Sequence, residues 1–495
     1  MKGVESDKKK GMNSNGRDCI DSVKLAVDNV SVETITYVPG YPITELAEAL
    51  EAEISVNEKV ALEICLGASA TGMRSMVIVK QVGMNLLSDP MVISATHTIG
   101  AGAVILVGDD LGPKGSQVEM DSRYLGPVAE LPVLDPRDAE TLYSSILEAY
   151  ALSERLRVPV IIRVTQRVLI SGTHVKAAAS EASGQIFDRS IWDITARGRH
   201  QRHHSEILHL AEAASESSSL NRMRISDDIG IIASGYPAML SQDFDRSLLA
   251  VGYAYPLSWK LIRDFIDAHR IVLVAEEPEP FIESQLRMSP KVRGRLTHHL
   301  PFGPLEKNDI QKALETADQK ITFNSSNYES AAERGYMGVC DDCPFASLFR
   351  ALGRLDVPVA GDAGCAIRAT REPYKSVDVV YGLGSSIGVA SGFKKKGVAV
   401  IGDFALAHSG IQGLINAIWH RRELLMVLLK NDIAATTGGQ RVPDLTKLLE
   451  VIVPTVRLEL PCSDELIERV LREELKRTGT SAVVALSVCP KYRLD

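Results

Sequence analysis

At 495 residues, the chain is long enough for about three domains, and its 45% hydrophobic content can bury ordinary cores. A formal net charge of −8, with no dense Lys/Arg block outside the N-terminus, argues against nucleic acid as the main partner. The polar N-terminus lacks the apolar core of a secretory signal. The uncharged run over residues 91–108 contains Thr96, His97 and Thr98, so we predict a buried helix and a strand there, not a membrane span. These features favour a cytoplasmic enzyme that acts on small molecules.

Residues 18–172 are predicted to form a first α/β domain. Apolar, β-branched segments alternate with helical patterns, which is typical of a doubly wound parallel sheet covered on both faces. The expected helices include Ile43–Ile54 and Ala139–Leu156. The expected strands are Thr34–Val38, Ser75–Val79, Ala103–Val107 and Pro159–Arg163.

Residues 173–226 differ in character, because they are rich in Ser, Ala, His and Arg, and we interpret them as a linker with helical pieces. The adjacent His203 and His204 suggest metal ligands. Adjacent residues do not share a helix face, however, and no further ligand pattern is evident. We therefore expect a solvated charged face.

Residues 227–322 predict a smaller α/β unit, with strands at Ile229–Ala233 and Ile271–Ala275 and a helix over Ser258–His269. An acidic run, Glu276 to Glu279, follows the second strand. Prolines 278 and 280 are expected to hold this run extended and in solvent.

Residues 336–495 predict a second doubly wound sheet, with strands at Val357–Ala360, Val377–Tyr381, Val398–Ile401, Leu424–Leu429 and Ala482–Ser487. Two strands end in polar residues: Gly402-Asp403 follows the third strand and Asn431 follows the fourth. Parallel sheets bind ligands at the carboxyl ends of their strands, and these side chains offer the oxygen ligands that Mg²⁺ takes beside phosphates. We predict a magnesium–diphosphate site here. The alternative is a Rossmann-like unit with an incidental Asp and Asn.

A glycine-rich turn over residues 382–388 follows the predicted strand Val377–Tyr381 and begins a helix. Its backbone N–H groups could face a phosphate. The candidate phosphate-binding residues are Gly384, Ser385, Ser386 and Ile387. Because 26 residues separate Gly402-Asp403-Phe404 from Asn431, the region resembles the signature of thiamine-diphosphate enzymes.

Glu58 begins a helix in the first domain, just after Asn57. One interpretation is that it only complements the helix dipole. The other is that it lies buried against the aminopyrimidine ring of thiamine, where burial favours the protonated form and the acid can shift the ring to its imino form. Glu63 is the second candidate for this role.

Cysteines form another constellation. Cys340 and Cys343 stand in a C-x2-C-P arrangement, Cys365 follows Gly364, and Cys489 precedes a proline. Four thiolates can hold a [4Fe–4S] cluster or a zinc ion, so ligand count leaves both open, along with ordinary unliganded cysteines. Cys462 could replace Cys489 as the fourth ligand.

Together these residues resemble the large (alpha) subunit of indolepyruvate ferredoxin oxidoreductases, in the 2-oxoacid:ferredoxin oxidoreductase superfamily. The resemblance implies a thiamine-diphosphate-binding fold, with the pyrimidine-binding domain at 18–172, a transketolase-C-terminal-like domain at 227–322 and the diphosphate-binding domain at 336–495. It implies oxidative decarboxylation of an aryl 2-oxo acid to its acyl-CoA, with thiamine diphosphate, Mg²⁺, coenzyme A and a [4Fe–4S] cluster that passes electrons to ferredoxin. The passages that carry it are Asn57–Asp89, Gly115–Tyr124, Tyr255–Glu283, Cys340–Pro344 and Gly384–Gln440.

The resemblance also implies site residues and partners. Glu58 matches the activating acid, and His408 stands where the family also has His. A smaller beta subunit is implied, in an (αβ)2 assembly, with the thiamine site between the pyrimidine-binding and diphosphate-binding domains. The implied cofactor and magnesium residues are Gly402, Asp403, Phe404, Asn431 and the backbone carbonyl of Ile433.

This chain departs from the family pattern in places. The family usually continues into a C-terminal ferredoxin-like module, whereas this chain ends at Asp495, so we expect ferredoxin or a separate ferredoxin-like subunit as the electron carrier. Tyr41 and Gln81 stand where the family has Thr and His, at expected substrate positions, which leaves the substrate class open. Arg123 could pair with the carboxylate of a 2-oxo acid or form a surface ion pair.

Three hypotheses follow. The leading one is a thiamine-dependent 2-oxo acid oxidoreductase subunit. The others are a non-oxidative thiamine-dependent decarboxylase or ligase with a structural cluster, and a cofactor-free scaffold subunit.

Overall fold

The structure is a computed structural model that describes residues 14–112, 114–172, 175, 185–322 and 338–492. It divides into two compact units, residues 1–325 and 326–495. The polar start of the chain and most of residues 173–184 lie outside the described residues. Among the described helices, none has both the length and the apolar character needed to cross a membrane.

The first unit is built around a seven-stranded sheet in the order β10-β5-β6-β4-β3-β1-β2. All neighbours are parallel except β10, which is antiparallel to β5. Every residue of β4 and β6 is buried, as expected for a sheet covered on both faces. The strands are β1 (Thr34–Tyr37), β2 (Glu53–Ile54), β3 (Ser75–Lys80), β4 (Ala103–Asp109), β5 (Val133–Leu134), β6 (Val160–Thr165) and β10 (Tyr253–Tyr255).

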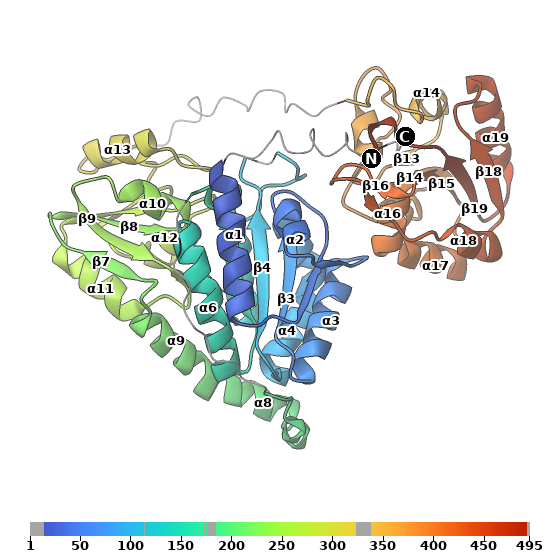
Figure 1. The fold of residues 1–495 in the computed structure, drawn as a ribbon. Coiled ribbons are helices and arrows are strands. Elements are labelled where there is room, and N and C mark those ends of the chain that lie inside the picture. The colour runs from blue at the N-terminus through green and yellow to red at the C-terminus, as the bar shows by residue number, and fades with distance from the viewer. Residues whose placement is uncertain (1–13, 113, 173–174, 176–184, 323–337, 493–495) are drawn as a thin grey trace. The chain divides into compact units, whose positions relative to one another are not determined.

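Helices pack in pairs beside this sheet, α1 with α6 and α3 with α4 (Figure 1). The predicted helix Ala139–Leu156 is confirmed; it begins at a capping box between Asp138 and Thr141 and ends where Arg157 turns left-handed. The predicted helix Ile43–Ile54 is too long, because the chain leaves the helix at Ala49 and adds β2 to the sheet edge. The helices are α1 (Ser14–Asn29), α2 (Thr44–Ala49), α3 (Glu58–Ala70), α4 (Met84–His97), α5 (Leu125–Ala129), α6 (Ala139–Leu156) and α7 (Gln166–Leu169).

A helical stretch connects this sheet to a second one. It runs through α8 (Ala196–Arg202), a π-helical turn (His203–Ile207) and α9 (Leu208–Ser217).

The second sheet has the order β12-β11-β8-β9-β7, parallel except for β7. Its strands are β7 (Arg222–Arg224), β8 (Ile229–Ser234), β9 (Ser247–Val251), β11 (Ile271–Ala275) and β12 (Val292–Arg293). Its helices are α10 (Tyr236–Ser241), α11 (Trp259–Ala268), α12 (Phe281–Leu286) and α13 (Lys307–Glu315).

The acidic run after β11 is buried, so the expectation that it lies in solvent was wrong. Glu276 and Glu277 are 0% exposed. Glu276 accepts hydrogen bonds from the N–H groups of Ile282 and Glu283, and Glu277 pairs with Arg167. Such partners are what buried carboxylates require, and the sequence run alone does not reveal them.

The second unit contains a five-stranded parallel sheet in the order β13-β14-β15-β19-β18. Alternate residues of β14 (Gly397–Gly402) belong to two separate apolar clusters. Val398 and Val400 belong to one, and Ala399 and Ile401 belong to the other. This alternation is the mark of a sheet with a core on each face. Its strands are β13 (Val359–Ala360), β14 (Gly397–Gly402), β15 (Leu424–Lys430), β18 (Thr455–Glu459) and β19 (Thr480–Leu486).

The remaining elements cover this sheet and its edge. The predicted strand Val377–Tyr381 is only a single bridge between Val379 and Ala360, because the Asp378 carboxylate accepts the Val359 N–H at 2.7 Å in place of a ladder carbonyl. The elements are α14 (Ala346–Gly353), α15 (Ser386–Ala390), α16 (Asp403–Ala405), a π-helical turn (Leu406–Gly410), α17 (Ile411–Trp419), α18 (Thr446–Ile452), α19 (Asp464–Lys476) and the hairpin of β16 (Ile433–Ala434) and β17 (Gln440–Arg441).

The α/β class with doubly wound parallel sheets and a smaller third sheet is confirmed. The finer division of the chain into four segments stays a prediction.

Candidate functional site

Asp403 and Asn431 lie together at the carboxyl edge of the sheet in the second unit. They follow β14 and β15, which are parallel neighbours in register from Gly397 and Leu424 onward. The Asp403 Oδ2 accepts the N–H of Asn431 at 3.0 Å and the N–H of Asp432 at 2.7 Å. The two ends of the sequence motif therefore meet as predicted.

Asp403 is a buried carboxylate, 8% exposed, that the backbone holds in place. Burial raises its pKa above the ordinary value, and the N–H groups of Asn431, Asp432 and Phe404 oppose that rise. A cation at this carboxylate would relieve the cost of burying its charge.

The turn after β15 orients a second oxygen. The Asn431 Oδ1 accepts the N–H of Ile433 at 3.3 Å, in an Asx-type turn. Asp432 has a φ of +60°, and the Lys430 ammonium pairs with it. Both oxygen-bearing side chains are thus positioned by local backbone geometry.

Gly384 is the residue of the glycine-rich turn that cannot carry a side chain. Its φ is +80°, and a Cβ there would overlap the Ser409 hydroxyl and lie 2.9 Å from the Gly410 nitrogen. The turn is held by Asp362, whose carboxylate accepts the N–H of Gly384 at 2.6 Å and of Ser386 at 3.1 Å. Burial raises the pKa of Asp362 to about 6.

Sequence reasoning missed Asp362, although the signal was present. Gly361-Asp362 follows a strand just as Gly402-Asp403 does. Two other predicted phosphate-binding residues of the glycine-rich turn have side chains with structural contacts. The Ser385 hydroxyl donates to the Gly382 carbonyl at 2.9 Å, and the Ile387 side chain is fully buried in the core.

His408 lies in the π-helical turn Leu406–Gly410, which directly follows α16. The Ser409 hydroxyl donates its one hydrogen to the Leu383 carbonyl at 2.9 Å, so it accepts from His408 Nδ1 at 3.1 Å. This contact assigns the proton to Nδ1. π-Helical turns within helices recur at functional sites.

Four cysteines of the second unit form one group. Burial, and then the neighbouring thiols of Cys343, Cys489 and Cys340, raise the pKa of Cys365 to about 12. The pKa of Cys462 is raised by burial and by Asp464 instead. Cys489, and not Cys462, is thus among the residues that shift the pKa of Cys365.

In the first unit, Glu58 is the first residue of α3 and is buried, 6% exposed. Its carboxyl group lies against Gly83, where a Cβ would be 2.5 Å from the Glu58 Oε1. Lys80 lies nearby: burial lowers its pKa, and Asp110 and Glu58 raise it in opposition. The sequence did not reveal that the buried acid Glu58 lies near the half-buried Lys80 at the end of β3.

Tyr41 and Gln81 face the loop that follows β4. The Gln81 amide donates to the Ser116 hydroxyl at 3.1 Å, and Ser116 donates to Asp110 at 2.8 Å. Burial, and then Asp110, raise the pKa of Tyr41 to about 12. The Tyr41 hydroxyl and the Gln81 Oε1 are buried without a hydrogen-bond partner among the described residues, which is rare for native polar groups.

Arg123 is fully buried, so the alternative of a surface ion pair was wrong. Its guanidinium donates to Asp121, to Glu276 at 2.9 Å and to the carbonyls of Glu277 and Glu279. Burial works against the charge of Asp121, but Arg123 outweighs it and holds the pKa of Asp121 below its ordinary value. This geometry assigns Arg123 to the junction of the two sheets in the first unit.

The chain is similar to known proteins in this region and over most of its length. The family profile described as "Thiamine pyrophosphate enzyme, C-terminal TPP binding domain" matches residues 362–450, a span that contains Asp362, Gly384, Asp403 and Asn431. The indolepyruvate oxidoreductase subunit IorA of Methanothermobacter thermautotrophicus is 30% identical over 471 residues, which cover 86% of this chain and 76% of that protein. The subunit of the same name from Methanothermobacter marburgensis is 29% identical over 515 residues, covering 94% and 83%.

Among solved structures, the fold is similar to that of a 2-oxoglutarate:ferredoxin oxidoreductase from Magnetococcus marinus with 2-oxoglutarate, coenzyme A and succinyl-CoA bound. It aligns with a TM-score of 0.49 at 15% identity, covering 61% of this chain and 65% of that chain. The sequence relatives carry the assignment, because their similarity extends over more than two thirds of both chains. The chain belongs to the family of indolepyruvate oxidoreductase IorA subunits, with a thiamine-pyrophosphate-binding domain at residues 362–450.

Proposed function

We propose that this chain is the thiamine-binding catalytic subunit of an enzyme that oxidatively decarboxylates an aryl 2-oxo acid such as indolepyruvate to its acyl-CoA and reduces ferredoxin. The observation that carries the proposal is the edge formed by Asp403, Asn431 and the turn at Gly384. It combines a buried carboxylate, an oriented amide oxygen and a turn that has no room for a side chain at Gly384. These are the features that Mg²⁺ and a diphosphate need.

At this edge, Asp403 and Asn431 would hold Mg²⁺ together with the backbone carbonyl of Ile433. The Asp403 carboxylate has lone pairs left after accepting three N–H groups, because two oxygens offer about four acceptor sites. Asp362 already accepts the N–H groups of Gly384 and Ser386 and keeps that turn in shape, so the N–H groups of Ser385 and Ile387 would bind the diphosphate oxygens.

Thiamine diphosphate supplies a nucleophilic carbon that adds to a ketone and stabilises the electron pair left when CO₂ departs. Glu58 would donate a proton to the aminopyrimidine ring and hold it there. The carboxyl group is placed for this role because it is buried, 6% exposed, and lies against Gly83. His408 is the second candidate for proton transfer, with its Nδ1 proton held by Ser409.

The thiols of Cys340, Cys343, Cys365 and Cys489 would hold a [4Fe–4S] cluster. Four thiolates suit zinc as well as an iron–sulfur cluster. The proposed oxidation needs a redox-active electron acceptor, which the cluster would supply and zinc would not.

Tyr41 and Gln81 are the proposed substrate contacts. Their buried, unpartnered oxygen and hydroxyl groups would gain hydrogen bonds from a polar substrate group. Coenzyme A is the proposed acyl acceptor. A smaller subunit is the proposed partner, in an (αβ)2 assembly, in line with relatives that are themselves named as subunits.

Anaerobic purification of the assembled enzyme from native cells tests this function. We expect thiamine, magnesium, iron and sulfide in the preparation, and ferredoxin reduction that requires both an aryl 2-oxo acid and coenzyme A. Thiamine without iron would replace the proposal by a non-oxidative decarboxylase or ligase. The absence of both cofactors would replace it by a scaffold role.

A further inference from the structure

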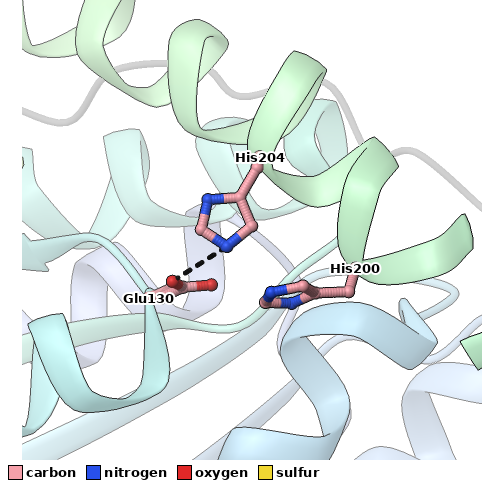
Figure 2. Close-up of side chains that lie close together, drawn as sticks. All are labelled: Glu130, His200 and His204. Carbon is pink, nitrogen blue, oxygen red and sulfur yellow. Dashed lines mark ion pairs between the residues drawn. The ribbon is translucent and has the colours of Figure 1, made fainter. Parts of the chain in front are cut away.

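Two histidines and a glutamate converge in the first unit, away from the residues assigned above to thiamine chemistry. Glu130 directly follows α5, and His200 and His204 project from the stretch formed by α8 and the π-helical turn (Figure 2). One ligand atom from each residue lies within 4.8 Å of the other two. They are the one such trio among the described residues.

The sequence around His203 and His204 shows no further metal ligand, but the folded chain brings two more candidate ligands, Glu130 and His200, next to His204. His204 does lie on a different face from His203, as expected for adjacent residues. Its true neighbour is His200, four residues earlier on the same face, with the two ring centroids 4.4 Å apart. Glu130 comes from a segment 70 residues earlier than His200, so no local spacing could reveal it.

The distances suit a transition-metal ion after small side-chain movements. Glu130 Oε1 lies 3.2 Å from His204 Nε2. Zinc bonds of about 2.0–2.2 Å in a tetrahedral arrangement separate neighbouring ligand atoms by about 3.4 Å. The Glu130–His204 separation already fits, and rotation of the partly exposed His200 ring would bring the third atom in.

A buried histidine beside the trio is an independent sign of a missing ligand. His203 is 2% exposed, and neither ring nitrogen makes a hydrogen bond of ordinary geometry with any described residue. Its Nε2 lies 3.4 Å from the other oxygen of Glu130. A metal on Oε1 would fix the carboxylate so that Oε2 could accept the His203 N–H, an arrangement that commonly orients metal ligands.

The backbone around the trio is also unusual on both sides. Glu130 has a φ of +56°, which is uncommon for a residue with a side chain. His203 and His204 begin a π-helical turn, a form that recurs at functional sites.

We propose that Glu130, His200 and His204 bind a divalent transition-metal ion of the zinc class, with His203 positioning Glu130 and a water completing the coordination. Two imidazoles favour zinc, nickel, copper or iron over magnesium and calcium, which prefer oxygen ligands. The bound metal fastens the connecting helices α8 and α9 to the end of α5. It is distinct from the proposed magnesium and iron sites.

Zinc titration of the full chain tests the site. After removal of bound metals, isothermal titration calorimetry and elemental analysis should count one more zinc ion per chain in the wild type than in Glu130→Gln, His200→Gln or His204→Gln. The cysteines are common to all variants, so they cancel in this difference. The matched control is His209→Gln, an exposed histidine on α9 that pairs with Glu212. It should retain the wild-type count.

His203→Gln separates positioning from ligation. It should keep the zinc ion but bind it about 10- to 100-fold more weakly. Hydrogen exchange of the wild type provides a readout that needs no variant: zinc should slow exchange in α8 and the π-helical turn. Equal zinc counts in the wild type and all three ligand variants, loss of zinc in the His209 control, or unchanged exchange with zinc would each overturn the site.

Discussion

Replacing Arg123 with Met should destabilise the first unit by about 3–5 kcal/mol. Met keeps much of the side-chain volume but leaves Asp121 and Glu276, both 0% exposed, without their counter-charge. At about 1.4 kcal/mol per factor of ten, amide exchange in β6 and β11 that proceeds through unit unfolding should accelerate about 100-fold to a few thousand-fold. Hydrogen-exchange mass spectrometry of the full chain measures this directly.

The matched control is Arg270→Met in the same unit. Arg270 also pairs with two carboxylates, Asp228 and Asp318, but these pairs are exposed and screened by solvent. It should leave exchange in β11 nearly unchanged. If Arg123→Met instead raised the KM for the 2-oxo acid with unaltered exchange, Arg123 would be a substrate ligand and the junction assignment would be refuted.

Three further outcomes are expected. Glu58→Gln should abolish turnover without weakening diphosphate binding; activity within about tenfold of wild type, a barrier change of about 1.4 kcal/mol, would count against its role. The broad visible absorbance of the iron–sulfur cluster should vanish in Cys340→Ser and Cys489→Ser and survive Cys462→Ser, and the reverse for the last two would move the fourth ligand. Burial raises the pKa of Asp362 from 3.8 to about 6, so the folded chain binds the extra proton between these values and stability falls as pH rises through them. The free energy of unfolding of the wild type, compared with that of Asp362→Asn, should thus fall by up to about 3 kcal/mol between about pH 4 and pH 7. A difference between the two proteins that does not change with pH would contradict this burial effect.

The strands and the central site residues were predictable because their signals are local. Runs such as Leu424–Leu429 are apolar throughout, as expected for buried strands. The polar residues that follow the two runs, Asp403 and Asn431, must lie at the same edge because the strands are parallel. Helix Ala139–Leu156 was predictable from its helical pattern of apolar residues, and the structure adds the capping box at Asp138.

The errors and omissions involve partners that are distant in sequence. Glu276 looked like a solvated residue, but Arg123, 153 positions earlier, neutralises it in the interior. Glu130 gave no sign of meeting His200 and His204. Burial of a charge depends on a partner that only the tertiary fold brings near, so patterns of spacing along one segment cannot reveal it.

The central claim is that Asp403 anchors magnesium and thiamine diphosphate. Isothermal titration calorimetry of thiamine diphosphate into the full chain, with Mg²⁺ present, tests it most directly when wild type, Asp403→Asn and the control Asp444→Asn are compared. Asp444 is a partly exposed carboxylate of the same unit that pairs with Lys430. The account predicts binding at least about 100-fold weaker for Asp403→Asn, about 2.7 kcal/mol, and unchanged binding for Asp444→Asn. Wild-type affinity in Asp403→Asn, with the fold intact by circular dichroism, would contradict it.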